Sequence, residues 1–79
     1  MTTLLNKLVS FTDNYDLPVV LIDDDGYIRK YPSIRYLIGL IPHSDILKHS
    51  FYVNGASQLD LNGEDNFAII YITYENNEV

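Results

Sequence analysis

The chain has no cysteine, and only five of its 79 residues are lysine or arginine. Without cysteine it can form neither disulfides nor the common thiolate-based zinc sites, which are the usual means of stabilising so short a domain. The scarcity of basic residues, together with a net charge of -6, argues against direct binding to nucleic acid, because phosphate contacts require lysine and arginine. We therefore expect no disulfide framework and no nucleic-acid partner.

Long apolar segments are also missing. No run approaches the ~20 apolar residues needed to cross a bilayer. The N-terminal segment has one lysine and no small-residue cleavage site of the kind that indicates a signal peptide. We therefore expect neither a membrane span nor a membrane partner.

Motifs for catalysis and for metal binding are absent too. The chain contains no Gly-x-Ser-x-Gly, no P-loop and no Gly-x-Gly-x-x-Gly. In an extended segment His43, Asp45 and His49 would not converge, which leaves no basis for a catalytic triad. Asp23 and Asp25 would share one face of a strand, but two carboxylates are too few for calcium. We therefore predict a protein that is not an enzyme and that uses no metal or cofactor.

What the chain does contain indicates one small globular domain over residues 1–79. Apolar residues make up 47% of the sequence, which is typical of a packed domain and too high for a disordered one. The 11 acidic residues outnumber the five basic ones, which suggests a partner with a basic surface. Seven tyrosines indicate a half-exposed sheet or a binding surface.

The most distinctive local feature is an acid cluster, Asp23-Asp24-Asp25-Gly26, placed directly after an apolar run. Adjacent carboxylates repel one another, so folding gains little from their proximity. An Asp-Gly pair between two β-prone segments is typical of a hairpin turn. The cluster therefore has two interpretations, a solvated turn and a contact surface for a basic partner. Residues 19–31 can form either a hairpin or an edge strand followed by a loop.

Periodicity predicts an α+β domain with two helices and a small antiparallel sheet of about four to five strands. The expected helices cover residues 2–12 and the segment from Ser33 to the stop signals Gly39 and Pro42. The expected strands and turns are strands 17–22, 27–31, 44–53 and a central strand 67–74, a hairpin turn at Asn54-Gly55, a return strand with Leu59 and Leu61, a polar turn at 62–66 and a polar tail at 75–79.

An apolar stripe of Ile34, Leu37, Ile38 and Ile41 recurs at helical spacing in the second expected helix. Such a stripe normally packs into the core. In a short chain with a thin core, part of it can instead stay open as a groove, and periodicity alone does not separate the two interpretations.

Residues 42–52 read Pro-His-Ser-Asp-Ile-Leu-Lys-His-Ser-Phe-Tyr. This segment resembles the signature strand of the phage uracil-DNA glycosylase inhibitor (Ugi) family, Pro-x-Ser-Asp-Ile-Leu-x-His-Thr-x-Tyr, with Ser50 as a conservative change. The identical positions are Pro42, Ser44, Asp45, Ile46, Leu47, His49 and Tyr52. The preceding stretch aligns without a gap and places Ile38-Gly39 at the end of the family's second helix. Further along the chain, Phe67-Ala68-Ile69-Ile70 resembles the family's Trp-Ala-Leu-Val strand, after a loop that is shorter than in the family. The resemblance thus covers residues 19–74 and is weaker outside the central segment.

The resemblance implies a small, acidic, cysteine-free inhibitor with one antiparallel sheet and two helices, which binds uracil-DNA glycosylase in its DNA-binding cleft. In the family an edge strand mimics the DNA backbone, and its central glutamate aligns with Asp25. The acidic edge implied for this chain is Asp23, Asp24, Asp25, Gly26 and Tyr27. Two acidic helix contacts of the family fall on Ser33 and Tyr36. The pocket that captures the enzyme's inserted leucine would consist of Ile34, Leu37, Ile38, Leu59, Leu61 and Ile70.

We therefore predict a divergent Ugi-like DNA mimic that inhibits base excision repair. It would act as a monomer in a 1:1 complex with the glycosylase, in the cytoplasm of a cell that hosts a phage or mobile element. Some positions depart from the family pattern: Ser33 and Tyr36 replace acids, Arg29 and Lys48 replace apolar pocket residues, and Asp25 is one methylene shorter than glutamate. The alternative is a small acidic interaction module that blocks or scaffolds a different basic DNA-processing or defence protein.

Overall fold

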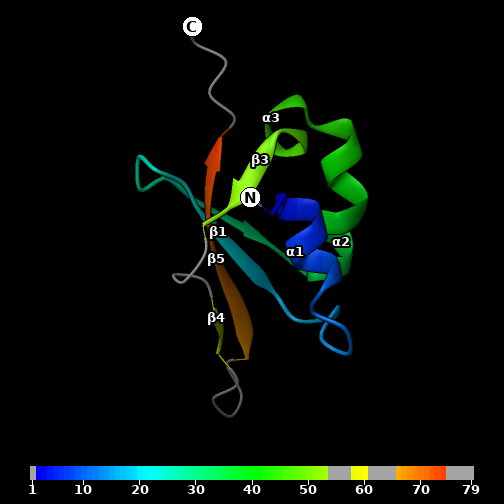
Figure 1. The fold of residues 1–79 in the computed structure, drawn as a ribbon. Helices are drawn as coiled ribbons and strands as arrows, with labels where there is room; N and C mark the ends of the chain where they lie inside the picture. The colour runs from blue at the N-terminus through cyan, green and yellow to red at the C-terminus, as the bar shows by residue number, and fades with distance from the viewer. Residues whose placement is uncertain (1, 54–57, 61–65, 75–79) are drawn as a thin grey trace, which may run out of the picture.

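The computed structural model describes residues 2–53, 58–60 and 66–74, which form an α+β domain. The elements in chain order are α1 (Leu4–Val9), β1 (Val19–Ile22), β2 (Ile28–Tyr31), α2 (Ile34–Leu40), the 3-10 turn η1 (Ile41–His43), α3 (Asp45–Lys48), β3 (Ser50–Tyr52), β4 (Gln58–Asp60) and β5 (Phe67–Tyr74). The helices gather on one side of the sheet (Figure 1). No helix in the described part of the chain has the length and apolar character that a bilayer span requires.

The sheet is mixed and is built around β5. Its strands run in the order β2-β1-β5-β3, and β4 pairs with the first half of β5. The long β-branched segment 67–74 is therefore a central strand, as predicted. The expectation of a wholly antiparallel sheet is wrong at one pair, because β1 and β5 are parallel, with Val19 opposite Ala68. Parallel neighbours need a long crossover, which the chain between β1 and β5 supplies.

Hydroxyl side chains cap the first two helices. The Thr3 hydroxyl accepts a hydrogen bond from the Asn6 N–H at 3.2 Å, and the Ser33 hydroxyl accepts one from the Tyr36 N–H at 3.0 Å. The first helix is shorter than the predicted 2–12, because it ends at Val9. The second ends at Leu40, between the two expected stop signals, and continues as a 3-10 turn.

The prediction of a strand over residues 44–53 is wrong for its first half. Residues Asp45–Lys48 form α3, and only Ser50–Tyr52 form a strand. The Ser44 hydroxyl accepts a hydrogen bond from the Leu47 N–H at 3.3 Å. A serine followed by an acid stabilises a helix start, and this local bond competes with strand pairing in a short alternating segment.

The core lies between the helices and one face of the sheet. Alternate residues of β1 and β5 point toward the helices and are buried, including Val19, Leu21 and Ile70. From the helices, Leu4, Leu8, Ile34, Leu37, Ile41 and Leu47 complete this core. The expected hairpin turn at 54–55, residue Leu61, most of the polar turn 62–66 and the tail 75–79 lie outside the described residues.

Candidate functional site

The acid cluster forms the turn of a β-hairpin, so residues 19–31 are two paired strands rather than a strand and a loop. The Asp23 N–H donates to the Tyr27 carbonyl at 3.2 Å, and the Gly26 N–H donates to the Asp23 carbonyl at 3.0 Å. Gly26 has a φ of 79°, a left-handed conformation that glycine adopts without steric cost. The turn projects beyond the body of the sheet (Figure 1).

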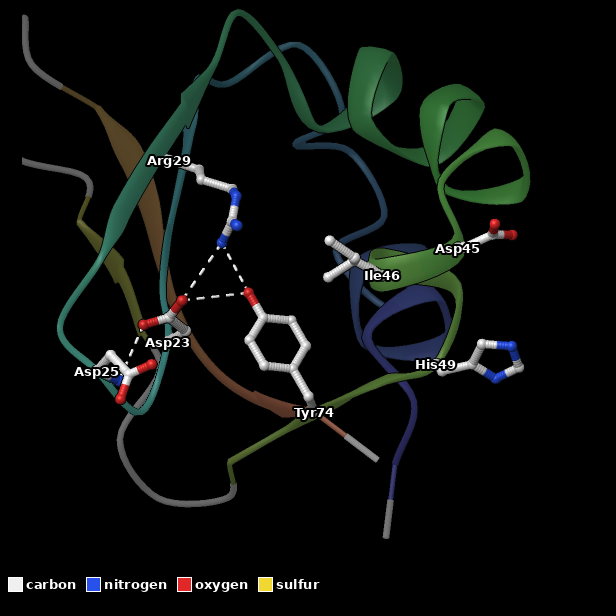
Figure 2. A pocket seen from close by; sticks show the side chains of 7 residues that line it. All are labelled: Asp23, Asp25, Arg29, Asp45, Ile46, His49 and Tyr74. Carbon is white, nitrogen blue, oxygen red and sulfur yellow. Dashed lines mark hydrogen bonds and ion pairs between the residues drawn. The ribbon is translucent and has the colours of Figure 1, made fainter. Parts of the chain in front are cut away.

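Asp23 is the most engaged of the three aspartates. One carboxylate oxygen accepts the backbone N–H groups of Asp25 at 2.9 Å and Tyr27 at 3.0 Å. The other accepts the Tyr74 hydroxyl at 3.2 Å and an Arg29 Nη1 at 3.4 Å (Figure 2). Only 6% of the Asp23 side chain is exposed. Both oxygens are therefore used inside the protein.

The same contacts set the charge of this carboxyl. Burial by itself raises the pKa of Asp23, but the N–H groups of Tyr27 and Asp25 and the side chains of Tyr74 and Arg29 outweigh it and hold the pKa below 3.8. Burial raises the pKa of the Tyr74 hydroxyl, which keeps it protonated as a donor. Asp23 is therefore an ionised acceptor at neutral pH.

Asp24, Asp25 and Tyr27 differ from Asp23 in being exposed. The Asp24 carboxylate accepts a hydrogen bond from the Thr73 hydroxyl at 2.5 Å, which ties the turn to β5. Asp25 contributes only its backbone N–H to the hydrogen bonds of the turn, so its carboxylate stands at the tip. The Tyr27 side chain is 60% exposed, and the Arg29 guanidinium lies 4.6 Å from its ring centre. The surface that the tip offers to a partner is therefore carried by Asp24, Asp25 and Tyr27.

The two predicted helix contacts have different environments. Ser33 uses its hydroxyl to cap α2, whereas the Tyr36 side chain is 54% exposed. The Tyr36 ring lies 6.5 Å from that of Tyr31, at the margin between α2 and β2. Tyr36 is thus available to a partner, and Ser33 has a structural role.

The residues predicted to form a leucine pocket are mostly core residues in the free protein. Ile34, Leu37 and Ile70 have no exposed surface, and Ile38 packs partly buried against them. Of the remaining predicted pocket residues, Leu59 lies in β4 and Leu61 is outside the described residues. The core-packing interpretation of the helix stripe therefore describes this conformation.

A hollow of about 500 Å³ lies elsewhere, between the hairpin tip and α3. Its lining residues are Asp23, Asp25, Arg29, Asp45, Ile46, His49 and Tyr74 (Figure 2). Arg29, which the alignment assigns to an apolar pocket position, lies beside the Asp23 carboxylate. Sequence reasoning did not assign Ile46 or Tyr74 to a site. The capping pattern at Ser44 could have indicated the short helix that carries Ile46. No local sequence pattern could have indicated Tyr74, because it contacts Asp23 across 51 positions of the chain.

Metal binding has no structural support in the part of the chain that the structure describes. No group of three or more histidine, aspartate or glutamate side chains there could hold an ion. The clustered acids around the tip are instead engaged with backbone N–H groups, hydroxyls and Arg29, or exposed to solvent.

Comparison with known proteins adds no relative. No protein-family model, no curated protein sequence and no solved structure matches this chain. The family hypothesis therefore rests on the sequence resemblance, which is strongest in residues 42–52, and the hydrogen bonds of the tip are independent of it.

Proposed function

We propose that this protein is a non-catalytic inhibitor of uracil-DNA glycosylase, which occupies the enzyme's DNA-binding cleft as a DNA mimic. One observation carries the proposal: an exposed carboxylate, Asp25, stands at the tip of an ordered hairpin, at the position that the resemblance aligns with the family's phosphate mimic. The domain has the α+β class that the resemblance implies.

The chemistry of such a cleft suits this tip. A groove that binds DNA presents backbone N–H groups and basic side chains to phosphates, and a carboxylate can accept the same hydrogen bonds. Asp24 and Asp25 lie side by side in the chain, so they present charge over a short distance. The net charge of -6 would also steer the protein toward a basic cleft.

The proposal places recognition mainly on the tip. A leucine from the enzyme could reach Ile34, Leu37 and Ile70 only if α2 moved away from the sheet, since these side chains have no exposed surface. If that movement occurs, burial of one leucine would contribute about 1.5–3 kcal/mol. The protein would act as a monomer in a 1:1 complex, in a cell that hosts a phage or mobile element.

An assay of uracil excision from DNA, with the protein added to several bacterial and viral glycosylases, tests this function. We expect inhibition that Asp25→Asn weakens by about tenfold or more, because it removes the charge that takes a phosphate's place. Asp13→Asn is the matched control, since Asp13 is exposed, lies far from the tip in the chain and tolerates asparagine at its φ of 72°. Absence of inhibition at micromolar excess would overturn the proposal, and equal effects of the two variants would overturn the role of Asp25.

A second function is favoured by Ser33 and Tyr36, which stand where the family has acidic contacts. On this alternative the protein is an acidic interaction module for a different basic DNA-processing or defence protein. The exposed rings of Tyr27 and Tyr36 fit a protein interface of another composition. This alternative predicts no effect on any glycosylase, together with salt-dependent binding of another purified basic protein that Asp25→Asn weakens.

A further inference from the structure

The hairpin tip is fastened to strand β5 by side chains that are distant in sequence. The Tyr74 hydroxyl donates to the Asp23 carboxylate at 3.2 Å and accepts from an Arg29 Nη1 at 2.7 Å. The Thr73 hydroxyl donates to the Asp24 carboxylate on the next residue of the turn. β1 and β5 run parallel, which brings the end of β5 alongside the turn that follows β1. The turn is thus held from outside as well as by its own hydrogen bonds.

The Asp23 carboxylate connects these contacts from Tyr74 and Arg29 to the backbone of the turn. The oxygen that faces away from Tyr74 and Arg29 accepts the N–H groups of Asp25 and Tyr27, which are two of the exposed residues at the tip. Arg29 also lies over the Tyr27 ring, at 4.6 Å from its centre. One connected set of contacts therefore links the backbone at Asp25 and the Tyr27 ring to Arg29 and Tyr74.

We infer that Asp23 is a positioning residue, which holds Asp25 and Tyr27 in a fixed presentation through Tyr74 and Arg29 and does not itself contact the partner. The role of Asp25 and Tyr27 as contacts for the partner rests on the proposed function, whereas their fixed presentation is a property of the free protein. Asp23 thereby differs from Asp24 and Asp25, which the resemblance groups with it in one acidic edge.

Two observations speak against direct contact by Asp23. Its side chain is 6% exposed, and each of its oxygens already accepts two hydrogen bonds. A partner's donor would have to displace one of these bonds. The adjacent Arg29 also offsets the charge of Asp23, so the net charge offered at the tip comes from Asp24 and Asp25.

Amide hydrogen exchange measured by NMR on the free protein tests the fixed presentation. Tyr74→Phe keeps the ring and removes only the hydroxyl, and we expect exchange at the Asp25 and Tyr27 amides to accelerate by about tenfold. Exchange at Ile70 and Ile72, in the buried part of β5, should stay unchanged. Unchanged exchange at the tip, or acceleration that spreads equally into β5, would overturn the inference.

Asp23→Asn provides an independent variant in case Tyr74→Phe perturbs the end of β5. Asparagine can still accept the two turn N–H groups through its carbonyl oxygen, but its amide nitrogen would face the donors of Arg29 and Tyr74. We expect faster exchange at the tip than in the wild-type protein. If the tip amides of this variant exchange at the wild-type rate, the contacts from Tyr74 and Arg29 do not position the turn.

A double-mutant cycle on glycosylase inhibition tests how the link acts on a partner. If Tyr74 acts through the tip, Tyr74→Phe should weaken inhibition by about tenfold in the wild-type protein and by less than about threefold in the Asp25→Asn background. Fully additive effects would contradict positioning. If no glycosylase is inhibited, the proposed function fails, while the exchange experiment still decides whether Asp23 fixes the tip.

Discussion

At the scale of single residues, the tip shows how three identical side chains acquire different properties from their neighbours. Asp23 is buried among four donors, Asp24 is exposed but bonded to Thr73, and Asp25 is exposed at the turn. A sequence-based argument could place an acidic turn here, because an Asp-Gly pair follows an apolar run. It could not show that Asp23 is enclosed while Asp25 is exposed, since the donors around Asp23 include Tyr74, 51 positions away.

The Asp23 carboxyl should make stability depend on acid. Its pKa in the folded protein lies below the ordinary 3.8, because its four hydrogen-bond donors outweigh the effect of burial. The unfolded chain therefore takes up this proton first as pH falls. The stabilisation from the Asp23 carboxylate is complete at pH values above 3.8, and it disappears as the pH falls through the lower pKa of the folded protein. Urea unfolding at about pH 6 and about pH 3 should show a larger loss of unfolding free energy for the wild-type protein than for Asp23→Asn. Equal losses would contradict this assignment.

Leu37 distinguishes a core residue from the lining of an open pocket. Its side chain has no exposed surface, so Leu37→Ala should leave a cavity and lower the free energy of unfolding by about 2–5 kcal/mol. Ile46→Ala is the control, because Ile46 is 57% exposed and should cost less than about 0.5 kcal/mol. Denaturant titration of both variants measures the difference. A cost for Leu37→Ala as small as that for Ile46→Ala would mean that the stripe is open in solution.

At the scale of elements, local chemistry predicted more than periodicity did. The Asp-Gly pair favoured the β1–β2 hairpin over an edge strand and loop without deciding between them, and Ser33 with its apolar stripe predicted α2. Alternation of apolar residues failed at α3, because its four residues fit a short helix as well as a strand and the Ser44 cap decides between them. The parallel pairing of β1 with β5 could not be read locally, since it depends on how the whole chain returns to the sheet. Whether the helix stripe is buried could not be read locally either, because burial is a tertiary property; Ile34 and Leu37 have no exposed surface in this conformation.

Ser33 offers a way to separate capping from recognition. Ser33→Ala should lower the free energy of unfolding by about 0.5–2 kcal/mol, because the Tyr36 N–H loses its acceptor. Ser33→Asp should retain the cap and place a negative charge at the start of α2, where a helix favours it. It also introduces an acid where the inhibitor family has one, so we expect it to strengthen inhibition of the glycosylase. Unfolding titrations and inhibition curves for both variants are the measurements. Weaker inhibition by a stably folded Ser33→Asp protein would argue against the family alignment at α2.

At the scale of the whole molecule, the fold separates a packed side from a charged tip. The helices cover one face of the mixed sheet and supply the core, so the β1–β2 turn is free to project from the sheet (Figure 1). Five basic residues are too few to neutralise the acids, and one of them, Arg29, is used inside the tip. The molecule as a whole therefore carries a negative field that favours encounter with a basic surface.

The rate of association with the partner should report this field. Raising the salt concentration from about 50 to about 300 mM shortens the screening length to well under 10 Å, so long-range attraction should fall and association should slow by about tenfold. Dissociation should change less, because it depends on short-range contacts. Stopped-flow binding to the glycosylase at several salt concentrations measures both rates. Asp13→Asn should lower the association rate slightly, through net charge alone, whereas Asp25→Asn should also accelerate dissociation. An association rate that does not respond to salt would show that the negative charge plays no part in encounter.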